Sequence, residues 1–160
     1  MKTKVIELLN KAVAEELYAV NQYMYFHFHC DDQGYDILAG LFKKIAIDEM
    51  KHLEEFAERI LFLKGDVNLV PSSEVKKVTT VKEMLELAKK LEDEAIEDYN
   101  KMANECAANN DAVSKKIFED IIAEEEKHFD QFDIELENLI KFGDNYLALQ
   151  SIERSKSNIK

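Results

Sequence analysis

Glycine, proline, cysteine and tryptophan are all scarce in this chain of 160 residues. It contains four glycines, one proline, two cysteines and no tryptophan. Since glycine and proline mark turns, so few of them indicate few connections and long helices, and the abundant Ala, Glu, Leu, Lys and Ile favour helix as well. We therefore predict an all-α fold in one domain, because 160 residues can bury a single sizeable core.

Cys30 and Cys106 are too few for a disulfide framework, and neither belongs to a C-x-x-C pair. We expect two reduced, partly buried thiols. The N-terminal segment carries lysines but no apolar run before Glu15 and Glu16, so the sequence predicts neither a secretory signal nor a transmembrane span, and we expect a cytoplasmic protein. A formal net charge of −12 argues against nucleic-acid or anionic-membrane partners and suits the handling of cations.

The most informative pattern is a Glu-x-x-His pair that occurs twice, as Glu49-Met-Lys-His52 and Glu125-Glu-Lys-His128. Each pair has a glutamate 33 positions before its own glutamate, namely Glu16 and Glu92. Glu16, Glu49 and His52 each recur after 76 positions, so six residues of the kinds that bind metals obey one internal repeat. A single Glu-x-x-His is common on solvated helical faces, whereas two copies with matched upstream glutamates indicate a metal-binding site.

Apolar periodicity predicts four long helices, at about residues 4–30, 35–64, from after Thr80, and about 111–142. All six repeat residues fall on the apolar stripes of these helices, so their side chains should face the core. Gly65 is placed to cap the second helix, and Thr80 with Glu83 fits a capping box at the start of the third.

The turns of the two predicted hairpins test this assignment. Residues that face each other across a hairpin must be equidistant from its turn, and the midpoints between the paired glutamates fall at Asp32-Gln33 and at Ala108-Asn109, both in turn-like sequence. The two hairpins should thus present their ligands at one level. Residues 65–79 are predicted to cross from one end of the bundle to the other, residues 145–152 to form a short fifth helix, and residues 153–160 to be a disordered polar tail after a domain of residues 1–152.

Four buried carboxylates need compensation, because an isolated one costs several kcal/mol or shifts its pKa by up to about 3 to 5 units. Two divalent cations would balance four glutamates, and two neutral imidazoles would add ligand atoms without charge. Mixed carboxylate and imidazole ligation favours Fe(II), Mn(II) or Zn(II) over Ca²⁺ or Mg²⁺.

With these residues in place, the chain resembles the bacterioferritins, which belong to the ferritin-like di-iron carboxylate proteins. Besides the ligand spacing, the resemblance is carried by Leu9-Asn-Lys, Asn21-Gln-Tyr23, Ile47-Asp-Glu-Met-Lys-His52 and Glu58-Arg-Ile-Leu-Phe-Leu63, and it spans about residues 3–152. It implies a ferritin-like four-helix bundle with a long crossover between helices 2 and 3 and a short fifth C-terminal helix.

The resemblance also implies a function, namely iron storage with ferroxidase activity. Fe(II) would be oxidised by O2 or H2O2 at a di-iron centre, and the Fe(III) mineral would be stored in a 24-subunit cage built from dimers. Its six ligands would be Glu16, Glu49, His52, Glu92, Glu125 and His128, with Glu49 and Glu125 bridging. Tyr23 would stand beside this centre, although a tyrosine on a core stripe also packs for its own sake. A ferredoxin-type electron donor would serve iron release.

Met50 breaks the repeat, because Glu126 stands at the equivalent position. One residue after Glu49, its side chain is rotated by about 100° and should face outward, on a strip with Ile47, Ala57 and Leu61 suited to a subunit contact. In bacterioferritins the methionine at this place binds the iron of haem b or a related porphyrin, one per subunit dimer, with one thioether from each subunit. The alternative is a methionine that only fills a dimer interface.

The resemblance departs from the family at Lys44, where some members carry a histidine of an accessory iron site on the inner surface, although Asp48 is present. Three other functions stay open. A rubrerythrin-like peroxidase would use the same ligands but normally carries a module with paired C-x-x-C motifs, which this sequence lacks. A cageless di-iron oxidase could use an external donor, and a haem-binding bundle would not store iron. We assign no role to Tyr99, and expect His27 and His29 to be surface or packing residues.

Overall fold

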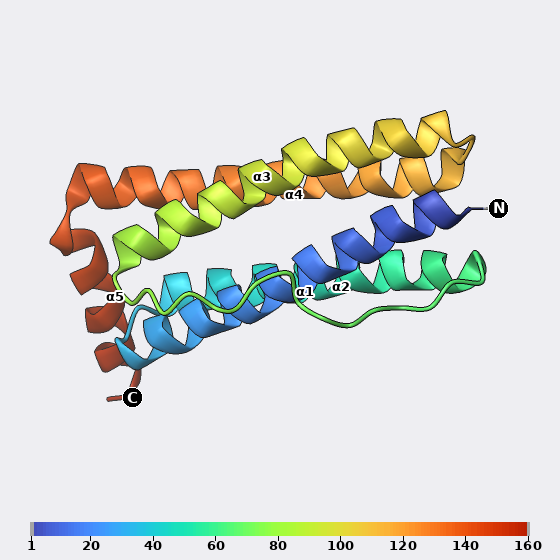
Figure 1. Cartoon of the computed structure of the whole chain (residues 1–160). Helices are drawn as coiled ribbons and strands as arrows, with labels where there is room; N and C mark the ends of the chain where they lie inside the picture. Colours follow the sequence, from blue (N-terminus) through green and yellow to red (C-terminus); the bar gives the residue numbers. More distant parts are fainter. Residues whose placement is uncertain (1, 160) are drawn as a thin grey trace.

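The computed structural model describes residues 2–159, which form five helices and no strand (Figure 1). The helices are α1 (Thr3–Asp32), α2 (Asp36–Phe62), α3 (Val81–Ala108), α4 (Ala112–Phe142) and α5 (Asp144–Ser157). The first four pack as two antiparallel hairpins, α1 with α2 and α3 with α4, and α5 turns away at one end of the bundle. The predicted four-helix bundle with a short fifth helix is confirmed. Met1, the first residue of the predicted domain, and Lys160, the last residue of the predicted tail, lie outside the described residues.

Both hairpin turns occur where the spacing of the glutamates predicts them. The turn between α1 and α2 contains Gly34 at φ 83°, and the turn between α3 and α4 contains Asn110 at φ 56°. Glycine and asparagine tolerate this left-handed conformation best, so the local sequence fixes both turns.

Two predicted helix caps differ from those in the structure. The left-handed residue after α2 is Lys64 at φ 65° and not Gly65, whose N–H donates to the carbonyl of Ile60 at 2.9 Å. Gly65 is needed for space instead, because a Cβ atom there would lie 2.7 Å from Cγ2 of Ile6. Thr80 is the N-cap residue of α3, but within residues 2–159 its side chain makes no capping hydrogen bond.

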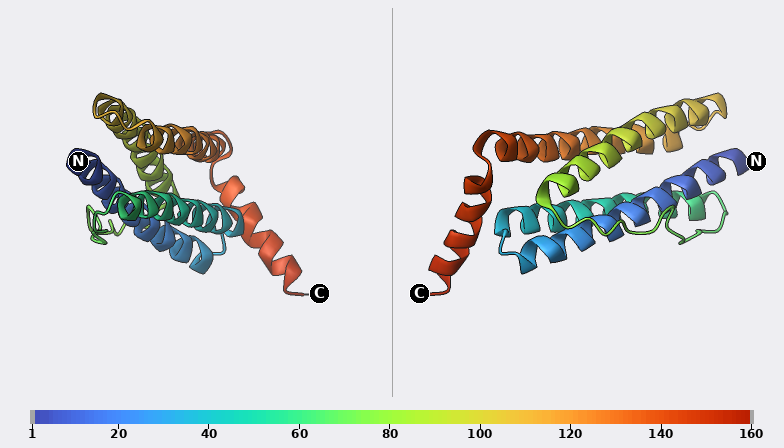
Figure 2. Two further views of the ribbon diagram at one scale, coloured as in Figure 1. Left: turned by 90° about the vertical axis from the view of Figure 1, so that its right-hand side faces the viewer. Right: turned by 60° about the vertical axis from the view of Figure 1, so that its left-hand side comes forward.

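The connection between α2 and α3 runs along the outside of α1 (Figures 1 and 2). Asn10 accepts a hydrogen bond from the N–H of Asn68, Ala14 accepts one from Ser72, and the side chain of Gln22 binds the backbone of Lys76. These contacts advance along α1 in chain order, so the segment crosses from one end of the bundle to the other. The predicted crossover is confirmed, and α3 therefore runs parallel to α2.

The buried apolar residues divide into two clusters at opposite ends of the bundle. One cluster includes Phe26, Phe42 and Phe132, and the other includes Leu9 and Phe118. The six glutamates and histidines of the repeat lie between the two clusters, so any charge they carry is enclosed by apolar layers on both sides.

Helix α5 continues to Ser157, and residues 153–157 of the predicted disordered tail are therefore helical. Tertiary contacts explain the difference. The guanidinium of Arg154 pairs with the carboxylates of Asp31 and Asp36 at the turn between α1 and α2, and the side-chain oxygen of Gln150 accepts a hydrogen bond from the N–H of Leu38. These partners are more than 100 positions away, which is why a local reading of the tail missed them. Among residues 2–159, no helix combines the length and the apolar character needed to cross a membrane.

Candidate metal centre

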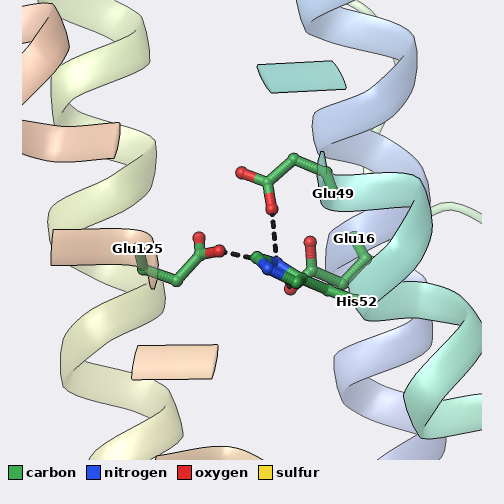
Figure 3. A group of neighbouring side chains, drawn as sticks. All are labelled: Glu16, Glu49, His52 and Glu125. Atoms are coloured by element: carbon green, nitrogen blue, oxygen red, sulfur yellow. Dashed lines mark hydrogen bonds and ion pairs between the residues drawn. The ribbon is translucent and has the colours of Figure 1, made fainter. Parts of the chain in front are cut away.

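The four long helices each place glutamate or histidine side chains in the middle of the bundle. All six predicted residues are at most 3% exposed: Glu16 on α1, Glu49 and His52 on α2, Glu92 on α3, and Glu125 and His128 on α4. Figure 3 shows Glu125 reaching from one hairpin toward Glu16, Glu49 and His52 of the other. The structure thus brings together the whole set that the repeat predicts.

These six residues form two overlapping groups of possible metal ligands. The first contains Glu16, Glu49, His52 and Glu125, and the second contains Glu49, Glu92, Glu125 and His128. In each group the potential ligand atoms lie within 4.8 Å of one another. Glu49 and Glu125 belong to both groups, so the geometry offers two neighbouring metal positions with two shared carboxylates.

The histidine rings turn their Nδ1 atoms toward the shared carboxylates. His52 Nδ1 lies 2.8 Å from Glu49 Oε2 and 2.8 Å from Glu125 Oε1. His128 Nδ1 lies 3.3 Å from Glu49 Oε1 and 3.7 Å from Glu125 Oε1. The two rings stack with their centroids 5.8 Å apart, so one imidazole serves each group.

Two buried tyrosines hold the unshared glutamates. The hydroxyl of Tyr23 donates to Glu92 Oε1 at 2.7 Å, and that of Tyr99 donates to Glu16 Oε1 at 2.6 Å. Each tyrosine thus binds the glutamate of the other hairpin, and the two contacts are related by the repeat. Tyr99, to which the sequence assigned no role, is equivalent to Tyr23 in this respect. Burial, followed by the adjacent glutamate, raises the pKa of each tyrosine well above 10, so both hydroxyls remain donors.

Two further carboxylates contact the far side of the histidine rings. Asp48 Oδ2 lies 3.1 Å from His128 Nε2, and Glu124 Oε2 contacts His52 Nε2. Sequence reasoning did not single out Glu124. The available signal was its position, because Glu124 immediately precedes Glu125 and stands 76 positions after Asp48, which immediately precedes Glu49.

Burial makes negative charge expensive at this site. It raises the pKa of Glu16 to about 7, against a partial opposing effect from His52, and it raises the pKa values of Glu49 and Glu92 well above their ordinary range with help from the neighbouring carboxylates. Burial lowers the pKa of His128. For His52 burial also acts downward, but the close carboxylates of Glu125 and Glu16 prevail and raise its pKa to about 10.

The donor atoms fit a pair of divalent cations. Within residues 2–159, four buried atoms of the centre make no hydrogen bond of suitable angle, although a histidine nitrogen or carboxylate oxygen lies close to three of them. These atoms are Glu49 Oε1, Glu92 Oε2, Glu125 Oε1 and His128 Nδ1. Buried polar atoms are normally paired, and two cations shared among these oxygens and nitrogens would satisfy them while balancing four carboxylates. The mixture of carboxylate and imidazole donors suits Fe(II), Mn(II) or Zn(II).

The centre is reached from two sides of the bundle. Between α1 and α3 a cavity of about 170 Å³ extends to Glu16, Glu49, Glu92 and Glu125, and its rim carries exposed acidic residues: Glu15, Glu94, Glu97 and Asp98. Between α2 and α4 a second pocket of about 250 Å³ is lined by Lys44, Asp48, Glu124 and His128, among others. Lys44 pairs with Asp48 at 3.3 Å, so an ammonium stands where an accessory iron site would need a ligand.

The remaining residues named from the sequence lie outside the centre. Met50 is 50% exposed on α2, and Ile47 and Leu61 are exposed on the same helix. The half-buried His27 donates a hydrogen bond from Nδ1–H to the carbonyl of Ala39 at 2.7 Å, and the ring of His29 packs on that of Tyr25. Cys30 and Cys106 are free thiols, buried more deeply than expected.

Comparisons with known proteins agree with this geometry. Residues 6–142 match the family model of the ferritin-like domain. The chain is 42% identical over 147 residues to a bacterioferritin of Desulfovibrio desulfuricans, covering 92% of this chain and 82% of that protein. It is 38% identical over 141 residues to a bacterioferritin of Brucella melitensis, covering 88% of each.

A solved structure gives the same answer for the fold. The X-ray structure of the Desulfovibrio desulfuricans bacterioferritin, determined with its diiron site in different catalytic states, superposes with a TM-score of 0.92. It shares 41% sequence identity with this chain, and the match covers 94% of this chain and 88% of that one. This chain therefore belongs to the bacterioferritin family of ferritin-like proteins.

Proposed function

We propose that this protein stores iron in the cytoplasm and that its metal centre is a ferroxidase site, which oxidises Fe(II) to Fe(III). The observation that carries the proposal is the pair of buried four-residue groups that share Glu49 and Glu125. Two bound Fe(II) ions supply the electrons that reduce O2 or H2O2. The four glutamates would balance the charge of the two ions, and the two histidines would add neutral donor atoms.

The acidic rim between α1 and α3 is the proposed entrance for Fe(II). Exposed carboxylates attract a divalent cation, and the cavity behind them leads to the buried glutamates. At the centre, each ion meets carboxylates whose pKa values are raised by burial, so binding a cation replaces a proton or relieves an uncompensated charge.

The protein groups must also release protons and hold their orientation. With a pKa of about 10, His52 is protonated at neutral pH and donates from both ring nitrogens, so Nδ1 must lose its proton before it binds a metal. Tyr23 and Tyr99 donate to Glu92 and Glu16, which orients one carboxylate oxygen of each. The hydrogen bond from Tyr23 to Glu92 supports our proposal that Tyr23 lies beside the site of Fe(II) oxidation.

The substitutions Glu16→Ala and His128→Ala test the site, because each removes a ligand of only one group. We expect both variants to lose most of the Fe(II) oxidation rate, followed by absorbance in rapid mixing of Fe(II) with aerobic protein. Glu126→Ala is the matched control, since it removes an exposed carboxylate from the same turn of α4 and should oxidise Fe(II) as the parent does. Parent-like rates in the first two variants would contradict the assignment.

Storage requires an assembly, and we propose the 24-subunit cage of this family, built from dimers. Large apolar side chains exposed on α4 and α5 support contacts between copies, among them Phe142 at 53%, Leu149 at 60% and Ile152 at 49% exposure. Exposed apolar side chains that lie together are typical of surfaces that contact another protein molecule.

We also propose that haem b or a related porphyrin binds between two subunits, with Met50 of each as axial ligand. The support is the 50% exposure of Met50 and its position among Ile47 and Leu61, because a soft thioether on an apolar surface suits ferrous haem. A ferredoxin-type donor would then deliver electrons through this group to release stored iron.

A further inference from the structure

Two carboxylates outside the proposed ligand set contact the histidines of the metal centre from behind. Glu124 on α4 contacts Nε2 of His52 on α2, and Asp48 on α2 contacts Nε2 of His128 on α4 at 3.1 Å. The opposite nitrogen of each ring, Nδ1, faces the shared glutamates. Each imidazole is therefore held between a carboxylate outside the centre and the atoms inside it.

The two contacts are copies of one arrangement. Asp48 and Glu124 are 76 positions apart, each immediately precedes a shared glutamate, and each reaches the histidine of the other hairpin. One step along a helix rotates a side chain by about 100°, which carries these carboxylates away from the middle of the centre to its α2/α4 side. The same contact occurring twice in the internal repeat is unlike a chance surface ion pair.

We propose that Glu124 and Asp48 are positioning residues, each of which accepts the Nε2–H of one histidine and so aims Nδ1, the nitrogen that binds the metal, at one metal position. Outer carboxylates of this kind fix the tautomer and the orientation of a histidine ligand, and losing one commonly costs about 10–100-fold in metal affinity. The inference rests on the proposed function, namely that the six residues bind two metal ions.

The two positioning residues act with unequal strength. Oδ2 of Asp48 is shared between His128 and the ammonium of Lys44, which lies 3.3 Å away. The repeat supplies no such competitor for Glu124, because the residue equivalent to Lys44 is Asp120. The Glu124 side chain is 52% exposed and that of Asp48 is 23% exposed, so neither substitution opens a cavity in the core. Glu124 should therefore matter more for the metal at His52 than Asp48 does for the metal at His128.

The test is calorimetric titration of Zn(II) into the full-length, chelator-treated protein at fixed pH. We expect the parent to bind two Zn(II) per subunit, and Glu124→Ala to weaken one of them by about 10–100-fold while leaving the other unchanged. Asp48→Ala should weaken one site by a smaller factor, and the double variant should weaken both. Glu124→Gln keeps an oxygen acceptor for Nε2–H and should retain an affinity between those of the parent and Glu124→Ala. Glu126→Ala, which removes the same charge from an exposed neighbour, should bind as the parent does.

The results separate this inference from the proposed function. If the parent binds two Zn(II) and the alanine variants bind both equally well, Asp48 and Glu124 do not position the histidines, while the metal centre stands. If Glu126→Ala loses as much affinity as Glu124→Ala, net charge explains the effect and the inference is wrong. If the parent itself binds no pair of metals, the proposed function fails and the inference with it. The midpoint temperature of thermal unfolding of the metal-free variants should match that of the parent. A purely structural role of Asp48 and Glu124 would lower this midpoint and would weaken both metal sites together.

Discussion

Replacing Glu16 by glutamine should stabilise the metal-free protein and weaken its response to metal. Glu16 is 2% exposed, and burial raises its pKa from 4.5 to about 7. Because this pKa is raised in the folded state, the folded protein retains the proton longer than the unfolded chain. The contribution of Glu16 to the free energy of unfolding is therefore fully present below pH 4.5 and is lost as the pH rises through about 7. Glutamine keeps the shape and the acceptor for Tyr99 but never ionises.

The magnitude follows from the two pKa values. The difference between 4.5 and about 7 corresponds to about 3 kcal/mol of unfolding free energy at pH 8, and to less than about 1 kcal/mol at pH 5. Nearby His52 loses a favourable partner in the variant, so we expect a gain of about 2 kcal/mol at pH 8. In a chain of this size that raises the midpoint of thermal unfolding by roughly 4–8 °C.

The assay is differential scanning calorimetry of chelator-treated parent and variant at pH 5 and pH 8, at one protein concentration because assembly also affects stability. Glu7→Gln is the control, since Glu7 is an exposed carboxylate on the same helix and should change the midpoint little at either pH. Excess Zn(II) should then stabilise the parent more than Glu16→Gln, which has lost a ligand charge.

Two results would refute the reasoning. If metal-free Glu16→Gln is less stable than the parent at pH 8, burial of the ionised Glu16 carboxylate does not destabilise the folded protein. If the difference between variant and parent is the same at pH 5 and pH 8, ionisation of Glu16 is not its cause.

The remaining predictions concern haem and assembly. Met50→Leu keeps an apolar side chain of similar size but removes the thioether, so it should abolish the haem absorption band of the purified protein and leave its assembly unchanged; a full haem band in this variant would exclude Met50 as the axial ligand. Light scattering coupled to size-exclusion chromatography should give the mass of a large cage for the parent, and a monomer or simple dimer would instead favour the cageless oxidase.

Much of the candidate centre could be predicted from the sequence because its residues obey two regularities at once. The repeat pairs Glu16 with Glu92 and His52 with His128, and helical periodicity turns all of them toward the core. Equal spacing on both arms of each hairpin then fixes their common level. Local rules sufficed, because the turns at Gly34 and Asn110 are marked by residues that tolerate a left-handed backbone.

Contacts between hairpins were beyond such rules. Apart from its place in the repeat, the exposed Glu124 resembles other charges on a helical face, and only the packing of α2 against α4 brings it to His52. The same holds for Tyr99, which reaches Glu16 across the bundle, and for residues 153–157, whose helix is secured by ion pairs between Arg154 and the turn after α1.

The sequence by itself determined the helices, the turns and the identity of six potential ligands, because periodicity and spacing are properties of a single chain. Only the tertiary structure decided which oxygen faces which nitrogen, so that Glu49 and Glu125 are shared between two groups and each histidine is held by a carboxylate of the other hairpin. The physical reason is that a side chain's burial, pKa and hydrogen-bond partners depend on the helices packed against it, and those helices come from distant parts of the chain.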